Sequence, residues 1–308
     1  MRAFLFPGQG SQMVGMGAAL ADASRPARDI FSEVDEALGQ NLFRLMREGP
    51  DEELKLTENA QPAIMAHSIA VLRTLGVDLP SVASFVAGHS LGEYSALCAA
   101  GSFDLSTTAK LLKLRGQAMQ QAVPVGEGAM AALLGANLVL AQQIADAAAQ
   151  GEVCTVANDN DPSQVVISGH EGAIDRAIAI AKDMGAKRAV ALPVSAPFHC
   201  PLMQPAAEAM SDALSYVVIE QPAVPVFANV TASAESDPDT IRGLLVDQVT
   251  GMVRWRESVG NMVQAGVEEF VEIGGKVLGP MVKRIVPDVK VTSVVTMEDI
   301  EALAKEIA

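Results

Sequence analysis

Short, almost wholly apolar runs alternate along the chain with longer segments in which apolar residues recur at helical spacing. The apolar runs include "RAFLF" near the start, "SVASFVAG" at 81–88, "EEFVEIG" at 268–274 and "KVTSVV" at 290–295. A strand buried on both faces produces such a run, and the helical spacing is typical of helices that pack one face on a sheet. The alternation predicts an α/β fold with a mostly parallel sheet, whose first helix we expect at about 13–22.

The pattern changes between residues 125 and 194. A turn and strand in "PVGEGAMAALLG" are followed by strand-like "EVCTVAND", "QVVISG" and "AKRAVALPV", and two helical stretches join these runs in the order β-α-β-β-α-β. That order is the split βαβ arrangement of ferredoxin-like units. We therefore expect an α/β core built from residues 1–124 and 195–308, with an inserted ferredoxin-like subdomain at 125–194.

Composition narrows the classes of partner and compartment. The 308-residue chain carries a formal net charge of -15, from 22 Lys and Arg against 37 Asp and Glu. Such a surface repels nucleic acid and anionic membranes, so we expect neither as a partner. The three cysteines show neither disulfide-like nor metal-ligand spacing, which fits a reducing compartment and predicts no metal. With no signal-peptide pattern and no apolar run of membrane-spanning length, we expect a cytoplasmic protein.

The stretch "FVAGHSLGEY" at 85–94 contains the pattern Gly-x-Ser-x-Gly, centred on Ser90. The residues before it predict a strand, and those after it predict a helix that closes near Gly101. A turn of this kind between strand and helix exposes the serine hydroxyl beside backbone N–H groups. Ser90 is therefore the candidate nucleophile, and the alternative is a structural serine in a tight turn.

A serine nucleophile needs a base, because its hydroxyl stays protonated at neutral pH. The chain has four histidines, His67, His89, His170 and His199. His89 adjoins Ser90 and should point away from it, His67 falls within a helical pattern, and His170 begins a helix. His199 lies in "SAPFHCPLM", a loop where the chain re-enters the core, and α/β folds place chemistry on such loops. We favour His199 as the base, with a packed loop histidine as the alternative.

The N-terminal loop "PGQGSQ" is rich in glycine but fits no nucleotide-binding motif. A dinucleotide fingerprint needs a third glycine where Met13 stands, and a P-loop needs a Gly-Lys-Ser/Thr run that this loop lacks. A glycine-rich loop at a strand end can still bring a backbone N–H close to a ligand, as in an oxyanion hole. The alternative is an ordinary strand-to-helix turn.

Six motifs follow one another along nearly the whole chain: "FPGQGSQ", "ENAQPA", "GHSLGEYSAL", "LRGQAMQ", "PFHCPLM" and "VRW". With this ordered set the sequence resembles the malonyl-CoA:acyl carrier protein transacylases of bacterial type II fatty acid synthesis, and it is similar to the acyltransferase domains of polyketide synthases. The resemblance implies an α/β-hydrolase-like core with a ferredoxin-like insert. The chain departs from the family at Met252, where proline is common, and in "EIGGKVL", which is one residue shorter than the usual motif.

The resemblance also implies the catalytic roles. Ser90 would be the nucleophile and His199 the base. Leu91 and Gln9 would supply the two backbone N–H groups of the oxyanion hole. Gln248 would orient the histidine through its backbone carbonyl, where hydrolases use an acid.

For the substrate, the resemblance implies that Arg115 holds the malonyl carboxylate and that Gln61, Asn158 and Asn160 lie near it. The reaction would be a ping-pong transfer through a malonyl-serine ester, from malonyl-CoA to the phosphopantetheine thiol of acyl carrier protein. The enzyme would need no cofactor of its own, and we expect a monomer.

Two other classes of protein remain to be distinguished. A serine hydrolase would share the turn at Ser90, but hydrolases of this fold place their histidine late in the chain, and no histidine follows His199. A non-catalytic subunit that binds the carrier protein would not need Ser90, His199 and Arg115 together. Transfer to a carrier thiol would indicate a transacylase, and release of free malonate would indicate a hydrolase. The absence of a covalent ester would indicate a non-catalytic subunit.

Overall fold

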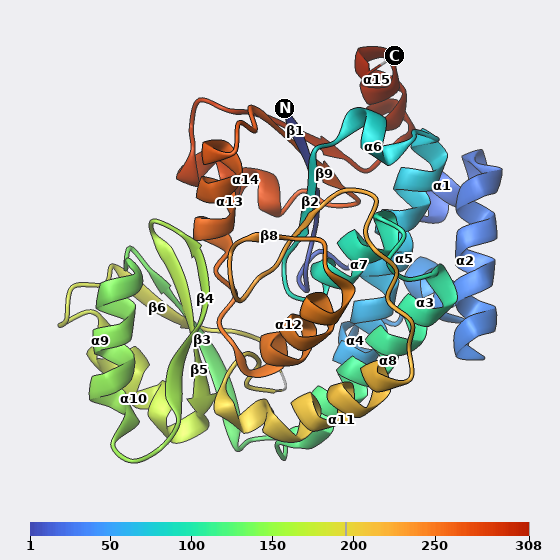
Figure 1. Ribbon diagram of the computed structural model, residues 1–308. Coiled ribbons are helices and arrows are strands. Elements are labelled where there is room, and N and C mark those ends of the chain that lie inside the picture. The colour runs from blue at the N-terminus through green and yellow to red at the C-terminus, as the bar shows by residue number, and fades with distance from the viewer. Residues whose placement is uncertain (195, 308) are drawn as a thin grey trace.

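The computed structural model describes residues 1–194 and 196–307, and all structural statements below concern these residues. Ser195 and Ala308, the two ends of the second expected core segment, lie outside the described residues. Figure 1 shows a larger sheet in the upper part of the molecule and a smaller sheet at the lower left, each covered by helices.

Six strands form the larger sheet: β1 (Arg2–Phe6), β2 (Phe85–Gly88), β7 (Val226–Phe227), β8 (Ala234–Glu235), β9 (Glu269–Ile273) and β10 (Lys290–Val294). Their order is β10-β9-β1-β2-β7-β8. All neighbouring pairs are parallel except β7 and β8, which are antiparallel. The expected α/β class with a mostly parallel sheet is confirmed.

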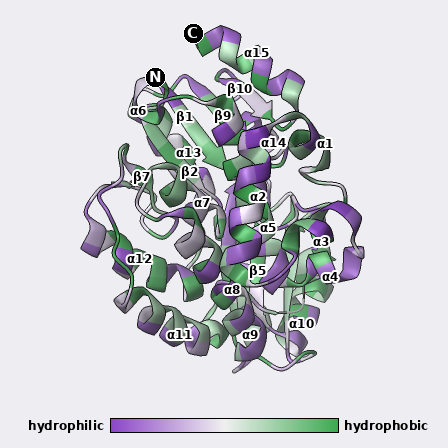
Figure 2. Cartoon of the chain, turned by 90° about the vertical axis from the view of Figure 1, so that its right-hand side faces the viewer, coloured by the Kyte–Doolittle hydropathy of each residue, from purple (hydrophilic) through white to green (hydrophobic). Residues whose placement is uncertain are grey.

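The helices that surround this sheet are α1 (Ala18–Ala23), α2 (Arg25–Leu38), α3 (Leu42–Glu48), α4 (Asp51–Lys55), α5 (Thr57–Leu75), α6 (Leu79–Val82), α7 (Gly92–Ala99), α8 (Leu105–Ala122), the 3-10 turn η1 (Pro201–Met203), α11 (Gln204–Ser215), α12 (Pro238–Thr250), α13 (Trp255–Gln264), α14 (Leu278–Ile285) and α15 (Met297–Ile307). They cover both faces of the sheet, because successive residues of a strand point to opposite sides. Phe4 and Phe6 share an apolar cluster with residues of α2, α5, α7 and α8, whereas Ala3 and Leu5 share another with α13 and α14. Figure 2 shows α2 at the front of the molecule, with hydrophilic and hydrophobic residues alternating along it.

The smaller sheet contains β3 (Gly128–Leu134), β4 (Cys154–Asp161), β5 (Gln164–His170) and β6 (Arg188–Ala191), with helices α9 (Leu138–Ala149) and α10 (Glu171–Ala181). Its antiparallel order is β4-β5-β3-β6, as in ferredoxin-like units. Ala131 and Leu133 of β3 pack on α9 and α10, while Met130 and Ala132, which alternate with them along the strand, face the main core. The expected β-α-β-β-α-β order is confirmed, and the domain boundaries at 124/125 and 194/195 stay a prediction.

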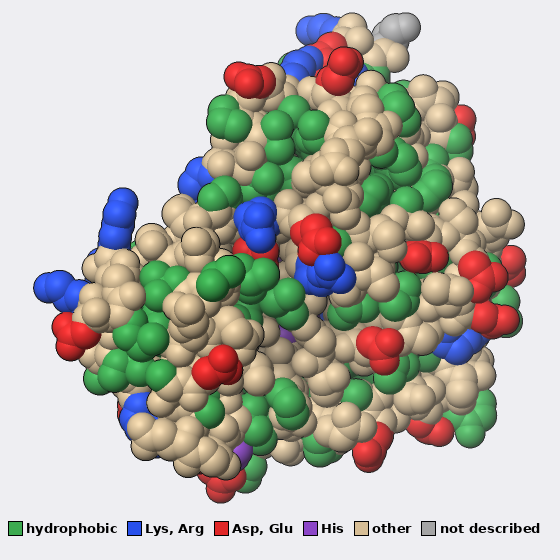
Figure 3. All heavy atoms as spheres, turned by 60° about the vertical axis from the view of Figure 1, so that its left-hand side comes forward, with side chains coloured by type: hydrophobic (Ala, Val, Ile, Leu, Met, Phe, Trp, Pro, Cys, Tyr) green, Lys and Arg blue, Asp and Glu red, His purple; other side chains and the backbone are tan. Residues whose placement is uncertain are grey.

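Strand β4 attaches the smaller sheet to the rest of the molecule. Asn158 forms a parallel bridge with Val253. The neighbouring Asp159 binds Arg256 at 2.8 Å. Asp161, a second buried carboxylate of β4, binds Arg284 at 2.7 Å. A buried carboxylate left without its arginine would be costly, so these pairs fix where β4 lies against α13 and α14. On the face shown in Figure 3, acidic and basic side chains are interspersed and do not form separate fields.

Two expected elements were wrong in extent. The helix expected at 13–22 begins only at Ala18, because Gly15 and Gly17 adopt φ values of 93° and 78°, which an α-helix does not allow. Only the second half of the strand expected at 81–88 is a strand, since Ser81 and Val82 belong to the short helix α6 and the strand begins at Phe85. No helix among the described residues is long and apolar enough to cross a membrane.

His67 makes the stability of the fold depend on pH. It lies in the middle of α5 with only 4% of its surface exposed, and its Nδ1 has no hydrogen-bond partner among the described residues. Burial lowers the pKa of His67 to about 4. Between the unfolded-state pKa of about 6.5 and this value, the unfolded chain binds a proton that the folded chain does not, so the free energy of unfolding falls as the pH falls.

We therefore expect His67→Gln to remove about 1.4 kcal/mol per pH unit from the slope of unfolding free energy against pH between about 4 and 6.5. Urea denaturation of both proteins across this range measures the two slopes. Above pH 7.5 the difference between the proteins should be constant. Parallel slopes below pH 6.5 would show that His67 takes up a proton equally well in the folded state.

Candidate active site

Ser90 stands on a sharp turn between the end of β2 and the start of α7, with a left-handed backbone φ of 54°. The flanking glycines are required by backbone contacts. A Cβ on Gly88 would lie 1.8 Å from the carbonyl oxygen of Gly92, and a Cβ on Gly92 would lie 2.2 Å from that of Phe6. The glycines thus permit the close packing of β2, α7 and β1 that holds the strained serine in place.

His199 contacts the hydroxyl of Ser90, with 2.7 Å between Nε2 and Oγ. Its Nδ1 lies 2.8 Å from the carbonyl oxygen of Gln248. Because a carbonyl only accepts, Nδ1 carries the proton and Nε2 is left to accept from Ser90. Burial, and after it the charge of Arg115, lowers the pKa of His199 to about 3, so its imidazole is neutral at pH 7. His199 also has a left-handed φ, 57°, which is uncommon for a residue other than glycine.

Arg115 brings a buried positive charge to the same point. Its side chain is 1% exposed and lies with its Cζ 5.8 Å from the centre of the Tyr94 ring. Nη1 donates to Oε1 of Gln61 at 2.8 Å, and Nη2 donates to Oε1 of Gln248 at 2.9 Å and to Oγ of Ser90 at 3.1 Å. Burial lowers the pKa of Arg115, but a guanidinium remains protonated in proteins.

Two backbone N–H groups near Ser90 are free to bind an oxyanion. Neither the N–H of Leu91 nor that of Gln9 has an acceptor among the described residues. The N–H of Ser90 itself, in contrast, donates to Oδ1 of Asn229 at 2.7 Å. The side chain of Gln9 accepts a hydrogen bond of 2.9 Å from Thr57, which fixes the glycine-rich loop against α5.

A cavity of about 420 Å³ lies between the two sheets, and its lining includes Gln9, Gln61, Ser90, Leu91, Arg115 and His199. Asn158 lies in its wall, whereas Asn160 is not among the lining residues; the Oδ1 of Asn160 is 2.8 Å from Nε2 of His89, which does line the cavity. Apolar side chains complete the lining, among them Met119 from α8 and Met130 from β3. The smaller sheet therefore contributes part of the wall of the cavity, through Met130 and Asn158.

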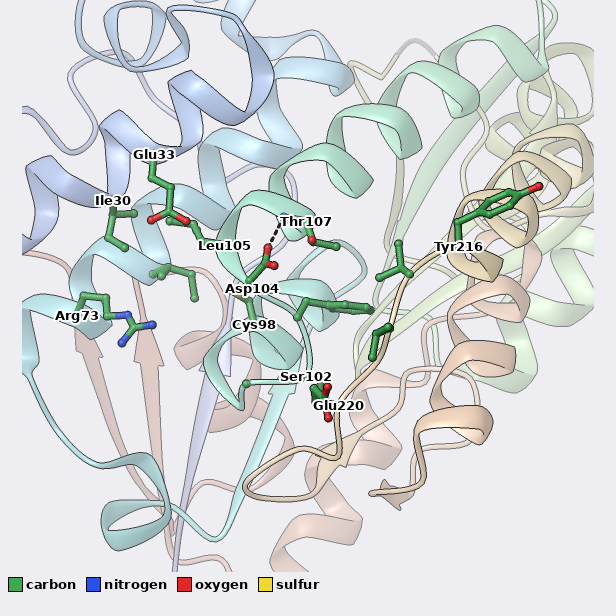
Figure 4. Close-up of a pocket in the computed structure, with 15 residues that line it drawn as sticks. Ile30, Glu33, Arg73, Cys98, Ser102, Asp104, Leu105, Thr107, Tyr216 and Glu220 are labelled. Atoms are coloured by element: carbon green, nitrogen blue, oxygen red, sulfur yellow. Dashed lines mark hydrogen bonds between the residues drawn. The ribbon is translucent and has the colours of Figure 1, made fainter.

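A second cavity, of about 700 Å³, contains none of the predicted site residues. It lies between α2, α5 and the start of α8, and Figure 4 shows Glu33, Arg73, Asp104 and Glu220 around it. Asp104 accepts a 2.6 Å hydrogen bond from the backbone N–H of Thr107, which caps α8 and makes the carboxylate structural. The candidate chemistry is thus concentrated in the smaller cavity.

Two buried residues of the site were missed by the sequence analysis. Glu93, 2% exposed, accepts hydrogen bonds of 2.9 Å from the backbone N–H of Asn229 and from Nε2 of Gln248. Burial raises the pKa of Glu93 to about 7, although both hydrogen bonds act to lower it. Asn229 also donates to the carbonyl of Gly88 at 2.7 Å. Glu93 stands in the first turn after the candidate nucleophile, a position that could have drawn attention to it.

Both the sequence and the fold of this chain have known relatives. Residues 3–285 match the family described as the acyl transferase domain. The chain is 45% identical over 285 residues to the malonyl CoA-acyl carrier protein transacylase of Escherichia coli (strain K12), which is 92% of each chain. It superposes with a TM-score of 0.97 and 51% identity on the acyl-carrier-protein-S-malonyltransferase of Bartonella henselae, over 99% of each chain. A malonyl-transacylase solved with its type II PKS acyl-carrier protein gives a TM-score of 0.96 at 40% identity, again over 99% of each chain.

Proposed function

This chain belongs to the acyl transferase family, and on that basis we propose that it transfers a malonyl group from malonyl-CoA to the phosphopantetheine thiol of acyl carrier protein. The transfer supplies fatty acid or polyketide synthesis. The observation that carries the proposal is the buried guanidinium of Arg115, 3.1 Å from the hydroxyl of Ser90, which in turn lies 2.7 Å from His199. A nucleophile and base beside a fixed positive charge suit an acyl group that ends in a carboxylate.

In the first half-reaction the hydroxyl proton of Ser90 passes to Nε2 of His199 while Oγ attacks the thioester carbonyl carbon. The carbonyl oxygen becomes an oxyanion and accepts from the N–H groups of Leu91 and Gln9, each worth about 3 kcal/mol in the barrier. The C–S bond then breaks, and the departing coenzyme A sulfur takes the proton back from His199. A malonyl ester remains on Ser90.

Gln248 replaces the acid of a hydrolase triad. Its backbone carbonyl, 2.8 Å from Nδ1 of His199, holds the ring in the tautomer that can accept from Ser90. A carbonyl carries no full negative charge, so it stabilises the imidazolium less than a carboxylate would. The ring is therefore oriented firmly but protonated only transiently, which agrees with the low pKa of His199.

The second half-reaction reverses these steps. The pantetheine thiol of the carrier protein gives its proton to Nε2 of His199, and its sulfur attacks the ester carbonyl on Ser90. When the C–O bond breaks, Oγ takes up the proton and malonyl-carrier protein leaves. Arg115 holds the malonyl carboxylate during both halves, with Gln61 and Asn158 nearby, and Asn160 is hydrogen-bonded to His89, the residue before the nucleophile.

The reaction needs no cofactor beyond the coenzyme A thioester and the pantetheine arm of the partner. We place the enzyme in the cytoplasm, in keeping with the three free cysteines Cys98, Cys154 and Cys200. A monomeric state stays a prediction.

The purified protein, mixed with malonyl-CoA, should gain the mass of one malonyl group and lose it again when holo-acyl carrier protein is added. Malonyl-carrier protein should form much faster than free malonate, because the base and nucleophile are shielded from water. Intact-mass spectrometry measures the gain and loss of the malonyl adduct. Chromatographic separation of malonyl-carrier protein from free malonate measures the rates of the two products. Free malonate as the main product would identify a hydrolase, and the lack of any adduct or transfer would identify a carrier-binding subunit.

A further inference from the structure

Glu93 is a buried carboxylate that the proposed reaction does not use. It lies in the first turn of α7, three residues after the nucleophile, and is 2% exposed. A buried carboxylate needs hydrogen-bond donors, and one oxygen of Glu93 accepts two, from the backbone of Asn229 and from the side-chain amide of Gln248.

The side chain of Gln248 joins three parts of the site. Its Nε2 donates to Glu93 at 2.9 Å and to the carbonyl oxygen of Ser90 at 3.0 Å. Its Oε1 accepts from Nη2 of Arg115 at 2.9 Å. If the amide were turned over, its oxygen would face the oxygens of Glu93 and Ser90, and its NH₂ group would face the guanidinium. Every one of these contacts would become repulsive, so Glu93 fixes which way the amide points together with the carbonyl of Ser90 and the guanidinium of Arg115.

That orientation places the guanidinium. Arg115 is held between two amide oxygens, Oε1 of Gln61 on one nitrogen and Oε1 of Gln248 on the other. The second nitrogen is also the one that lies 3.1 Å from Oγ of Ser90. With the amide of Gln248 reversed, this nitrogen would lose its acceptor and the guanidinium would move away from the acyl position.

We propose that Glu93 is a positioning residue for substrate selection: by fixing the amide of Gln248, it holds the guanidinium of Arg115 where the carboxylate of a malonyl group arrives. Glu93 does not touch the substrate. Through Arg115 it raises kcat/KM for acyl groups that end in a carboxylate more than it raises kcat/KM for acetyl. The proposal rests on the proposed malonyl transfer.

The test compares kcat/KM for malonyl-CoA and acetyl-CoA, because a residue that only supports the fold would lower both equally. Glu93→Met keeps the volume and removes the acceptor, and the malonyl-to-acetyl ratio should fall about 10- to 100-fold. Glu93→Gln restores an acceptor oxygen and should recover most of the ratio. Gln248→Met should lower the ratio as much as Glu93→Met does, and the double variant should lower it no further.

Glu272 provides a matched control. It is also a fully buried carboxylate, which accepts from the backbone N–H groups of Val277, Leu278 and Gly279 at the start of α14. Glu272→Gln should lower the melting temperature and leave the substrate ratio unchanged.

An equal loss of both activities in Glu93→Met, or an unchanged ratio in it, would overturn the proposal. Should Glu93→Met fail to fold, an unchanged ratio in Gln248→Met would overturn it equally, since Glu93 acts through that side chain. A wild-type protein that never malonylates the carrier refutes the proposed function, whereas an active wild type with unchanged ratios in the variants refutes only the role of Glu93.

Discussion

Ser90→Ala should abolish the covalent malonyl adduct and reduce malonyl transfer by about a million-fold. Among the described residues, the hydroxyl of Ser90 is placed to bond with the acyl carbon, since it lies 2.7 Å from Nε2 of His199 and in the same cavity as Leu91 and Gln9, whose N–H groups have no acceptor there. Alanine leaves the oxyanion hole and the substrate contacts, so binding of malonyl-CoA should persist. Intact-mass spectrometry after mixing with malonyl-CoA, and the rate of malonyl-carrier formation, measure the two losses.

Ser95 offers a control on the same helix. It is fully buried, and its hydroxyl has no hydrogen-bond partner among the described residues. Ser95→Ala should therefore form the adduct at the wild-type rate. A stable malonyl adduct on Ser90→Ala would mean that another residue is the nucleophile, and the proposed mechanism would fail.

Arg115→Ala should reduce kcat/KM for malonyl-CoA by about 200- to 5,000-fold, because breaking a buried charge pair costs about 3–5 kcal/mol. Acetyl-CoA presents no carboxylate, so its kcat/KM should fall much less and its relative activity should rise. Some loss with both substrates is expected, since Arg115 also donates to Oγ of Ser90. The ratio of the two kcat/KM values is therefore the measurement that reports carboxylate binding.

Arg115→Lys should recover only part of the malonyl preference. The guanidinium uses separate nitrogens for Gln61 and Gln248, and a single ammonium cannot hold both amides and a carboxylate in the same geometry. Lys113, a cation on the same helix that binds Asn59 outside the cavity, is the control, and Lys113→Ala should keep the wild-type ratio. If Arg115→Ala lowers kcat/KM for malonyl-CoA and for acetyl-CoA by the same factor, the arginine supports the fold or the carrier step and does not bind the malonyl carboxylate.

Local sequence was sufficient to predict the sheet and the turn at Ser90. Buried parallel strands produce continuous apolar runs, so β1, β2, β9 and β10 could be located before any contact was known. The turn at Ser90 needs glycine two residues away on each side because of backbone contacts within a few residues. Elements whose ends depend on backbone conformation were predicted less well, as the late start of α1 after Gly17 shows.

The long-range partners could not be derived from local pattern. His199 was chosen among four histidines from its loop, but its distance of 2.7 Å to Ser90 spans 109 positions of the chain. Arg115 and Gln248 were named only because the motifs resemble a known family. Nothing in the residues around them indicated that one side chain of Gln248 would meet Ser90, Glu93 and Arg115.

The sequence by itself determined the fold class, the nucleophilic turn and the acidic, cysteine-poor character of this protein, because each depends on residues close together in the chain or on composition alone. Only the tertiary structure decided the buried polar network and the wall that Met130 of the smaller sheet contributes to the cavity. The physical reason is that a buried polar side chain takes its role from its hydrogen-bond partner. For Glu93 that partner, Gln248, lies 155 positions away.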